Sequence, residues 1–469
     1  MSIVNTLRKT IRYGQKNGWR PAFYTALERV RQRKEQEYTY RPVPEQELLR
    51  QRDYVFQHPY KISILVPTYE TKPAFLRALI DSVMEQTYPH WELILADAST
   101  GSIVKNTVSE YEDERIHYEK LQENGGISVN TNQAMKYATG EYCALLDHDD
   151  LLTPDALFEM AFAIEKAKEQ GIDPAFLYSD EDKCDTDAKI YFDPHYKLDF
   201  NYELLLTNNY ICHFLVIKTE LLQQTGFRKQ YDGAQDFDLV LRLVKAVRQQ
   251  EKAGSNWQAR IIHIPGILYH WRCHMNSTAD NPESKMYAYE AGRMALKDYY
   301  QANDIACEVE HGMHLGFYQT VYQSMDALFC QRKEVGATGG LLVHKRKITG
   351  GAYTEDGNIL YRGICKNFAG YMNRLHLAQN VDAVDIRCMR IPKRWEQLYQ
   401  DIVGVAYQDT LPAEASADVY HVRTKRLPSD NHFSGMSEEE IRQKSIAFCK
   451  AVRAAGEEIV LNPLYRIKI

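Results

Sequence analysis

KISILVPT, residues 61–68, is a nearly continuous apolar run with the length of a buried strand. A helical pattern follows at 73–86, and further strand-like runs follow at 91–99, 115–121 and 141–150, with a helix-like stretch at 127–140. Strands that alternate with helices in this way predict an α/β fold, with a mostly parallel sheet and helices on both of its faces.

Polar side chains gather where these predicted strands end. Thr68 and Glu70 follow the first strand, Asp97 follows the second, and Asp147 and Asp149 follow the fourth. Ligands of open α/β sheets bind beyond the carboxyl ends of the strands. The sequence therefore predicts a binding site at this edge of the sheet.

The acidic run 147–150, DHDD, suggests a cation site. Alternation along a strand would project Asp147 and Asp149 to the same side. Two neighbouring carboxylates are unfavourable unless a cation lies close to them, and oxygen ligands suit Mg²⁺ or Mn²⁺. The alternative is an acidic helix N-terminus, because Thr153 and Pro154 are typical of a helix start.

Length and composition indicate a globular protein of two domains. The chain has 469 residues, 44% of them apolar and 26% charged, and its net charge of −6 argues against a nucleic-acid binder. The nine cysteines form no C-x-x-C pair, which suits reduced thiols. No apolar run is long enough to span a bilayer, and the N-terminus lacks a secretory signal, so we expect a cytoplasmic protein.

Residues 1–56 predict a basic helical segment. Residues 1–34 contain nine Lys or Arg and one acidic residue, Glu28, with apolar residues at roughly helical spacing between them. Such a helix can lie on an anionic membrane. We therefore expect peripheral contact with the inner face of the cell membrane; the alternative is a helix that packs on the main domain.

Six motifs together resemble the family 2 glycosyltransferases of the GT-A (Rossmann-like) fold. They are ILVPTYE (64–70), Asp97, NGGISVNTNQA (124–134), LLDHDDLLTPDAL (145–157), GAQDFDLVLRL (233–243) and LYHWRCHMNS (268–277). The resemblance is greatest to bacterial surface-polysaccharide enzymes of the rhamnan or O-antigen type. It implies an inverting hexosyltransferase that uses Mn²⁺ or Mg²⁺ and moves a sugar from a UDP- or dTDP-sugar to a lipid-linked glycan acceptor.

The resemblance also implies a nucleotide-sugar site. Thr68 and Glu70 fall where the family contacts the nucleobase and ribose, and Asp97 matches the acid that hydrogen-bonds the base. Asn132 matches a residue that supports the sugar nucleotide, and Asp147 one that touches ribose or sugar. The Arg that often precedes this Asn is a Thr here.

For the chemical step, the resemblance makes Asp236 the general base and Asp149 the metal ligand. The Glu that often precedes this base is a Gln here, and a helix N-cap is the alternative role for Asp236. Arg272 is expected to clamp the diphosphate. His274 is the first choice for a second metal or phosphate contact, and His270 is the second choice.

An acceptor site is expected at a loop of three acidic residues, Asp180, Glu181 and Asp182, and at Trp271. A solvated turn is the alternative for the loop, and core packing is the alternative for Trp271.

Residues 306–469 resemble one half of a second GT-A domain. GATGGLLVHKRKITGGAY (336–353) and IVLNPLYRIKI (459–469) look like its acceptor half, and the nucleotide half is missing. We therefore expect a catalytic domain at 57–305 and a degenerate domain at 306–469, with Asp409 at the former base position. The degenerate domain would bind acceptor, form a homodimer or dock a partner transferase.

Two other functions remain open at this stage. A nucleotidyltransferase that makes nucleotide sugars would need a Gly-rich basic loop after the first strand, and VPTYETKP (66–73) has none. A non-catalytic scaffold derived from a transferase would not need Asp149 and Asp236. The donor sugar, the linkage and the oligomeric state cannot be read from the sequence.

Overall fold

The computed structural model describes residues 14–15, 18–35, 38–250, 256–274, 286–411, 423–427, 432–433 and 435–469. Their contacts form two compact units. The N-terminal sheet unit comprises Tyr38–Phe200 and Asn209–Tyr299, and the C-terminal sheet unit comprises Met1–Glu37, Asn201–Asn208 and Tyr300–Ile469. Compactness does not show which parts fold independently, so the domain limits at about 56 and 305 remain a prediction.

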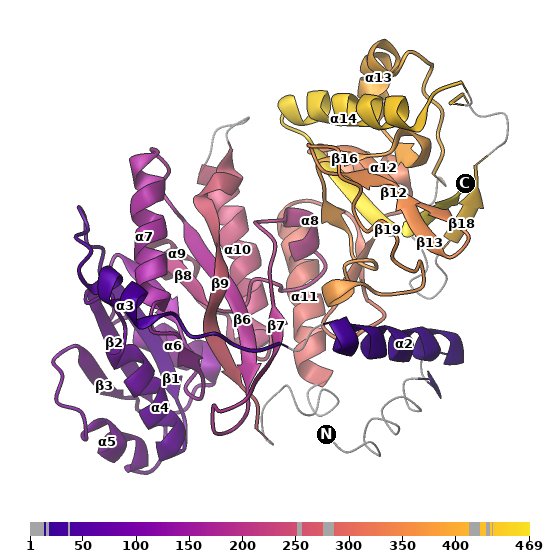
Figure 1. Cartoon of the computed structure of the whole chain (residues 1–469). Coiled ribbons are helices and arrows are strands. Elements are labelled where there is room, and N and C mark those ends of the chain that lie inside the picture. The colour runs from indigo at the N-terminus through magenta and orange to yellow at the C-terminus, as the bar shows by residue number, and fades with distance from the viewer. Residues whose placement is uncertain are drawn as a thin grey trace. The chain divides into compact units, whose positions relative to one another are not determined.

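The N-terminal sheet unit is built on one sheet with the strand order β3-β2-β1-β4-β8-β6-β9-β5, and β7 pairs with β6 (Figure 1). β1 to β4 are mutually parallel, β8 is antiparallel to β4 and β6, and β6 and β9 are parallel. The strands are β1 (Ile62–Thr68), β2 (Trp91–Asp97), β3 (Ile116–Lys120), β4 (Tyr142–Leu145), β5 (Leu151–Leu152), β6 (Phe176–Cys184), β7 (Tyr191–His195), β8 (Leu215–Lys218) and β9 (Ile261–Arg272).

Helices cover both faces of this sheet, as the sequence predicts. Ile62, Ile64 and Val66 of β1 join one buried cluster with residues of α4 and α7, while the intervening Ser63 and Leu65 are also fully buried and α6 packs on β1 and β2. The helices are α3 (Glu45–Arg52), α4 (Pro73–Met84), α5 (Ile103–Val108), α6 (Ile127–Met135), α7 (Ala156–Glu169), α9 (Thr219–Thr225), α10 (Gln235–Gln250) and most of α11 (Met286–Ala302).

The C-terminal sheet unit repeats part of this arrangement. In the first unit α10 leads into β9, which lies parallel to β6, and β6 forms a hairpin with β7. In the second, α14 leads into β19, which lies parallel to β12, and β12 forms a hairpin with β13 (Figure 1). No counterpart of β1 to β4 occurs among the described residues of this unit. The prediction of a smaller α/β part with its own sheet is thus confirmed, and its origin as half of a second GT-A domain stays a prediction.

The strands of the second unit are β10 (Glu308–His311), β11 (Tyr318–Val321), β12 (Val335–His344), β13 (Lys347–Gly350), β14 (Ala352–Tyr353), β15 (Gln379–Asn380), β16 (Ala383–Val384), β17 (Met389–Arg390), β18 (Arg423–Arg426) and β19 (Glu458–Lys468). Its helices are α2 (Trp19–Glu35), α8 (Tyr202–Leu205), α12 (Met325–Gln331), α13 (Glu396–Val403) and α14 (Glu438–Ala454). Asp409, expected at the former base position, accepts a hydrogen bond from Tyr407 at 2.5 Å and pairs with Arg390 at 3.4 Å.

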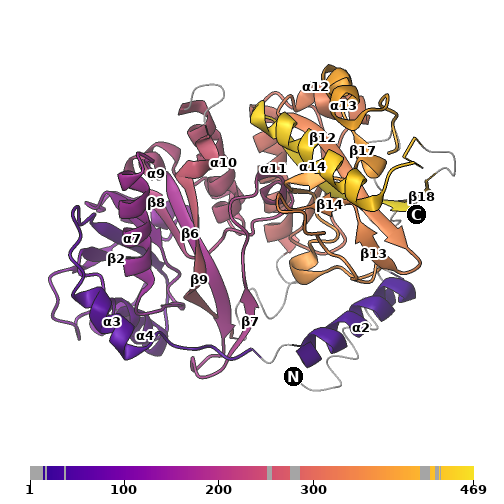
Figure 2. The same cartoon turned by 45° about the horizontal axis from the view of Figure 1, so that its top comes forward.

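The helix α2 belongs to the C-terminal sheet unit (Figure 2). The Glu28 carboxylate accepts hydrogen bonds from the backbone N–H groups of Ala369 and Gly370, at 2.9 and 2.8 Å. Of the predicted basic segment 1–56, residues 1–13, 16–17 and 36–37 lie outside the described residues. Within the part of the chain that is described, no helix combines the length and apolarity needed to cross a bilayer.

Candidate active site

The carboxyl ends of β1, β2 and β3 bring together the first group of predicted site residues. Asp97 is fully buried; its Oδ1 accepts hydrogen bonds from the backbone N–H of Ser99 at 2.9 Å and the Thr68 hydroxyl at 3.4 Å. Its Oδ2 accepts from the Tyr118 hydroxyl at 2.8 Å and lies 3.4 Å from the Lys120 ammonium. The carboxylate is thereby held in one orientation at the edge of the sheet.

Glu70 lies beside this group but is exposed to solvent. Its carboxylate accepts hydrogen bonds from the backbone N–H and hydroxyl of Thr100, both at 2.9 Å, and these bonds lower the pKa of Glu70. Glu70 adopts a left-handed backbone with φ of 49°, which is uncommon for a residue other than glycine. The loop after β1 therefore presents a fixed, charged carboxylate to solvent.

The acidic run 147–150 forms a turn beyond β4, which ends at Leu145, and the Asp150 N–H donates to the Asp147 carbonyl at 3.1 Å. Strand alternation therefore does not decide where these carboxylates point. Asp150 is buried, and its oxygens accept from the Tyr269 hydroxyl at 2.5 Å and the backbone N–H of Arg272 at 2.7 Å. Burial raises the pKa of Asp150 well above its usual range.

Asp149 and the end of β9 form the next part of the site. Nε2 of His274 lies 2.8 Å from the Asp149 carboxylate, and Nε of Arg272 donates to the Asp149 carbonyl at 2.6 Å. Arg272 is 2% exposed, its Nη1 donates to the Thr186 carbonyl, and its Nη2 has no hydrogen-bond partner among the described residues. A buried guanidinium with a free donor is suited to an anion.

Three further donor atoms could hold a cation. One carboxylate oxygen each of Asp147 and Asp150 and one ring nitrogen of His213 all lie within 4.8 Å of one another. Burial raises the pKa of Asp147, His213 opposes this effect, and neighbouring Asp149 adds to it. The turn therefore concentrates carboxylates in a place where a cation would lower their free energy.

Asp236 lies in the first turn of α10, opposite the segment that precedes β8. Its Oδ2 accepts hydrogen bonds from the Asn209 amide at 3.0 Å and the Cys212 thiol at 2.9 Å. Next to Cys212, Nδ1 of His213 lies 2.9 Å from Glu181. Two donors thus orient the carboxylate that the sequence predicts as the general base.

Residues 63–226 match a family model described as glycosyl transferase family 2. WcaA of Escherichia coli, provisionally named a colanic acid biosynthesis glycosyl transferase, is 30% identical over 210 residues, which cover 43% of this chain and 72% of WcaA. The chain belongs to glycosyl transferase family 2. This confirms the family that the six motifs predict.

Two longer proteins also resemble this family 2 chain. The uncharacterized protein y4gI of Sinorhizobium fredii is 39% identical over 242 residues, or 51% of this chain and 25% of y4gI. The O-antigen biosynthesis protein RfbC of Myxococcus xanthus is 32% identical over 252 residues, or 53% of this chain and 18% of RfbC. The aligned part of this chain thus spans a quarter or less of either relative.

The family 2 domain uses Asn132 to join two of its segments. The Asn132 side chain lies on α6, donates to the Phe227 carbonyl and accepts from the Phe227 N–H, both at 2.8 Å. Phe227 precedes Asp236 by nine positions. Asn132 therefore positions the chain segment that leads to Asp236.

The prediction of an acidic loop at 180–182 is wrong, because these residues lie in the middle of β6 and are buried. Asp180 accepts from the backbone N–H groups of Lys197 and Gly266 and contacts His263. Lys197 and His213 hold the pKa of Glu181 well below its usual range, although burial alone would raise it. These contacts connect β6 to neighbouring segments. Trp271 is half-buried and packs against the core cluster, and its role at the acceptor stays a prediction.

The structure also separates the two histidine candidates. Nδ1 of His270 lies 2.5 Å from Asp182, whose other oxygen accepts from the Tyr38 hydroxyl at 2.6 Å. His274 is the histidine that contacts Asp149. The sequence analysis assigns no role to Asn209, Cys212 or His213, because these residues belong to none of the six motifs.

Proposed function

We propose that this family 2 chain is an inverting glycosyltransferase that moves a sugar from a UDP- or dTDP-sugar to a lipid-linked glycan in bacterial surface polysaccharide synthesis. The observation that carries this proposal is the convergence of Asp149, His274 and the free donor of Arg272 at the turn that follows β4. The names of RfbC and WcaA support the polysaccharide context. The chain matches only 18% of RfbC. The donor, the acceptor and the product are therefore proposed here and are not taken from that relative.

On this proposal Asp97, Thr68 and Glu70 receive the nucleobase and ribose, and Asp147 contacts the ribose or sugar. Arg272 supplies its free Nη2 donor to the diphosphate, which would replace a missing hydrogen bond with a charge-assisted one. Burial strengthens that interaction, since the guanidinium is only 2% exposed.

The residues present fit a divalent cation. The Asp149 oxygen and the His274 nitrogen lie 2.8 Å apart, and both atom types can bind a cation. Burial raises the pKa of Asp147, and the neighbouring Asp149 adds to this effect. Asp149 and His274 would hold Mn²⁺ or Mg²⁺, with Asp147 as a neighbour. When bound, such an ion would neutralise charge on the departing diphosphate.

Asp236 acts as the general base in this proposal. The acceptor hydroxyl gives its proton to the Asp236 carboxylate while its oxygen forms a bond to the anomeric carbon. The bond from that carbon to the diphosphate oxygen breaks, the electron pair leaves with the nucleotide, and the anomeric configuration inverts. The donors Asn209 and Cys212 keep the carboxylate oriented for this step.

The test measures binding and hydrolysis of UDP-, dTDP- and GDP-sugars with Mn²⁺, for the wild type, Asp149→Ala and the control Asp187→Ala. Asp187 is an exposed acidic residue of the same unit. We expect one uridine or thymidine donor to bind with metal, with loss of binding in Asp149→Ala and not in Asp187→Ala. If no nucleotide sugar binds the wild type, the scaffold alternative replaces this proposal.

Helix α2 supports the proposed contact with a membrane. Trp19, Phe23, Leu27 and Val30 recur at helical spacing and are 63, 63, 45 and 55% exposed. Glu28 instead faces the C-terminal sheet unit through its bonds to Ala369 and Gly370. An exposed apolar stripe in a basic segment fits an anionic bilayer surface.

Vesicle sedimentation tests this contact. We expect the chain to sediment with vesicles rich in phosphatidylglycerol and not with pure phosphatidylcholine, and Phe23→Asp to abolish sedimentation. Val55→Asp serves as the control, since Val55 is 85% exposed outside α2. Equal sedimentation of both variants would contradict the proposal for α2.

A further inference from the structure

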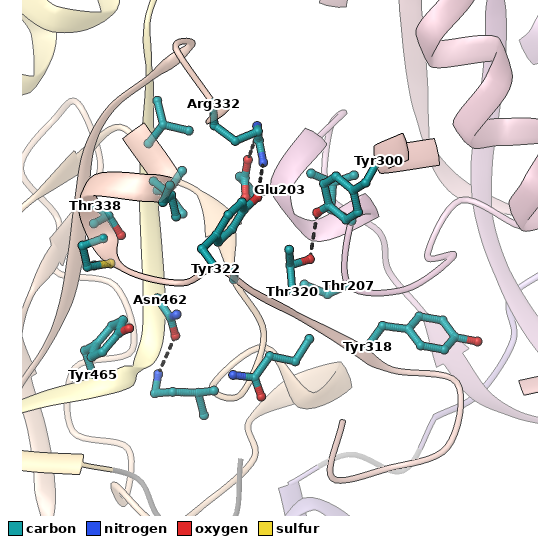
Figure 3. Close-up of a pocket in the computed structure, with 18 of the residues that line it drawn as sticks. Glu203, Thr207, Tyr300, Tyr318, Thr320, Tyr322, Arg332, Thr338, Asn462 and Tyr465 are labelled. Carbon is teal, nitrogen blue, oxygen red and sulfur yellow. Dashed lines mark hydrogen bonds and ion pairs between the residues drawn. The ribbon is translucent and has the colours of Figure 1, made fainter. Parts of the chain in front are cut away.

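A cavity lies within the C-terminal sheet unit, built from α8, the end of α11, β11, α12, β12 and β19 (Figure 3). All of its lining residues belong to this unit. Its volume of about 70 Å³ is room for roughly five water molecules. The cavity is therefore distinct from the nucleotide-sugar site.

Strand register brings three polar side chains to this cavity. Thr338 on β12 pairs with Val460 on β19, and Asn462 lies two positions further on β19. β15, which pairs with β19 at Leu461 and Val460, follows His376 by three residues. Thr338 and Asn462 both line the cavity and are labelled in Figure 3.

Each of these three side chains keeps a polar group without a partner among the described residues. The Thr338 hydroxyl makes no hydrogen bond, Asn462 uses only Oδ1, which accepts from the Leu464 N–H at 3.1 Å, and Nδ1 of His376 is buried and unpaired. Burial lowers the pKa of His376 to about 3, with help from Arg466 and His314, so the imidazole is neutral. Buried polar groups normally have partners, so an unpaired set suggests a ligand.

The two charged side chains on the wall neutralise each other. Arg332 forms an ion pair with Glu203 and donates to Glu334 at 2.6 Å, and Figure 3 shows the Arg332 and Glu203 side chains next to Tyr322. No uncompensated cation faces the cavity among the described residues that line it. A phosphate or carboxylate ligand would therefore lose its hydration shell without gaining a charged partner, so its binding here is unfavourable.

The remaining wall is aromatic. Tyr300, Tyr318, Tyr322 and Tyr465 line the cavity and are 2 to 6% exposed, and the Tyr300 hydroxyl is already bonded to Thr320 at 2.8 Å. Aromatic surface beside uncharged hydrogen-bonding groups suits a molecule with both C–H faces and hydroxyls.

We propose that this cavity binds one neutral sugar unit, with its hydroxyls on Thr338, Asn462 and His376 and its C–H face on the tyrosines. The C-terminal sheet unit would then hold a glycan independently of the nucleotide-sugar site. The proposal does not depend on the transferase reaction, because none of the residues that line the cavity belongs to the nucleotide-sugar site.

The test is saturation-transfer NMR on the full chain with the methyl glycosides of glucose, galactose, rhamnose and N-acetylglucosamine. UDP and Mn²⁺ are added to occupy the nucleotide site. The variants are Thr338→Val, which keeps the shape and removes the hydroxyl, and Asn462→Asp, which keeps the acceptor and removes the donor. Thr349→Val is the matched control, because Thr349 lies on β13 of the same sheet and its hydroxyl donates to the Leu342 carbonyl instead.

We expect at least one glycoside to bind, with affinity about three- to tenfold weaker in each cavity variant, as loss of one hydrogen bond predicts. Thr349→Val should bind like the wild type, and all three variants should keep wild-type binding of the nucleotide sugar. Absence of binding by every glycoside, or equal binding by wild type and both cavity variants, would overturn the proposal. If the wild type binds a glycoside but no nucleotide sugar, the result would count against the proposed transferase function and not against the sugar site in this cavity.

Discussion

Replacing Asn132 with alanine should loosen the segment that leads to Asp236. The change removes two hydrogen bonds of 2.8 Å, one to each backbone group of Phe227. At about 1 kcal/mol each, they contribute about 2 kcal/mol to the free energy of unfolding. The higher helix propensity of alanine offsets roughly 0.6 kcal/mol of this loss in the free energy of unfolding.

A matched control removes the propensity effect. Asn106 lies on α5 of the same unit, is exposed and makes no side-chain hydrogen bond among the described residues. Asn106→Ala should therefore be slightly stabilised, and the free energies of unfolding of the two variants should differ by about 2 kcal/mol.

Two measurements check this prediction. Denaturant titration gives the difference in free energy, and hydrogen exchange reports the Phe227 amide directly, because its acceptor disappears in Asn132→Ala. Faster exchange of residues 226–234, with slower turnover and unchanged donor affinity, is the expected pattern. Unchanged exchange at Phe227, or a difference below about 0.5 kcal/mol, would refute the positioning role of Asn132.

Three further predictions follow from the N-terminal sheet unit. Asp236→Asn should lower kcat by roughly 10²- to 10⁴-fold with little change in donor affinity; wild-type turnover in this variant would exclude Asp236 as the base. Burial alone would raise the pKa of Glu92, but Lys61 at 2.6 Å and hydrogen bonds from Ser63 and Thr139 lower it to about 2 from an ordinary 4.5. The stabilisation is therefore present above pH 4.5 and is lost as the pH falls towards 2. In acid titrations, the free energy of unfolding should change with pH by up to about 3 kcal/mol less in Glu92→Gln than in the wild type. Burial raises the pKa of the Cys212 thiol to about 12, so iodoacetamide at pH 8 should modify the exposed Cys330 first, as mass spectrometry can check; prior labelling of Cys212 would contradict its burial.

Much of the fold and part of the site could be predicted from local sequence. KISILVPT and the runs that follow it form parallel strands because apolar strands alternate with amphipathic helices. Parallel strands end at one edge of a sheet, so Thr68, Asp97 and the acidic run had to lie near one another whatever the details of packing. The separate sheet of the C-terminal part could also be predicted, because its strand and turn patterns are local.

Only the tertiary structure decided which side chains meet. His270 and His274 are four residues apart, yet one contacts Asp182 and the other Asp149. His270 lies on β9 as the register partner of Asp182, whereas His274 lies beyond the end of that strand. The carboxylates of 180–182 suggest a polar loop, since the sequence does not show that Lys197 and histidines from other segments would compensate their charge. Short patterns determine strands, helices and turns, whereas pairing of charged groups depends on contacts between residues far apart in the chain.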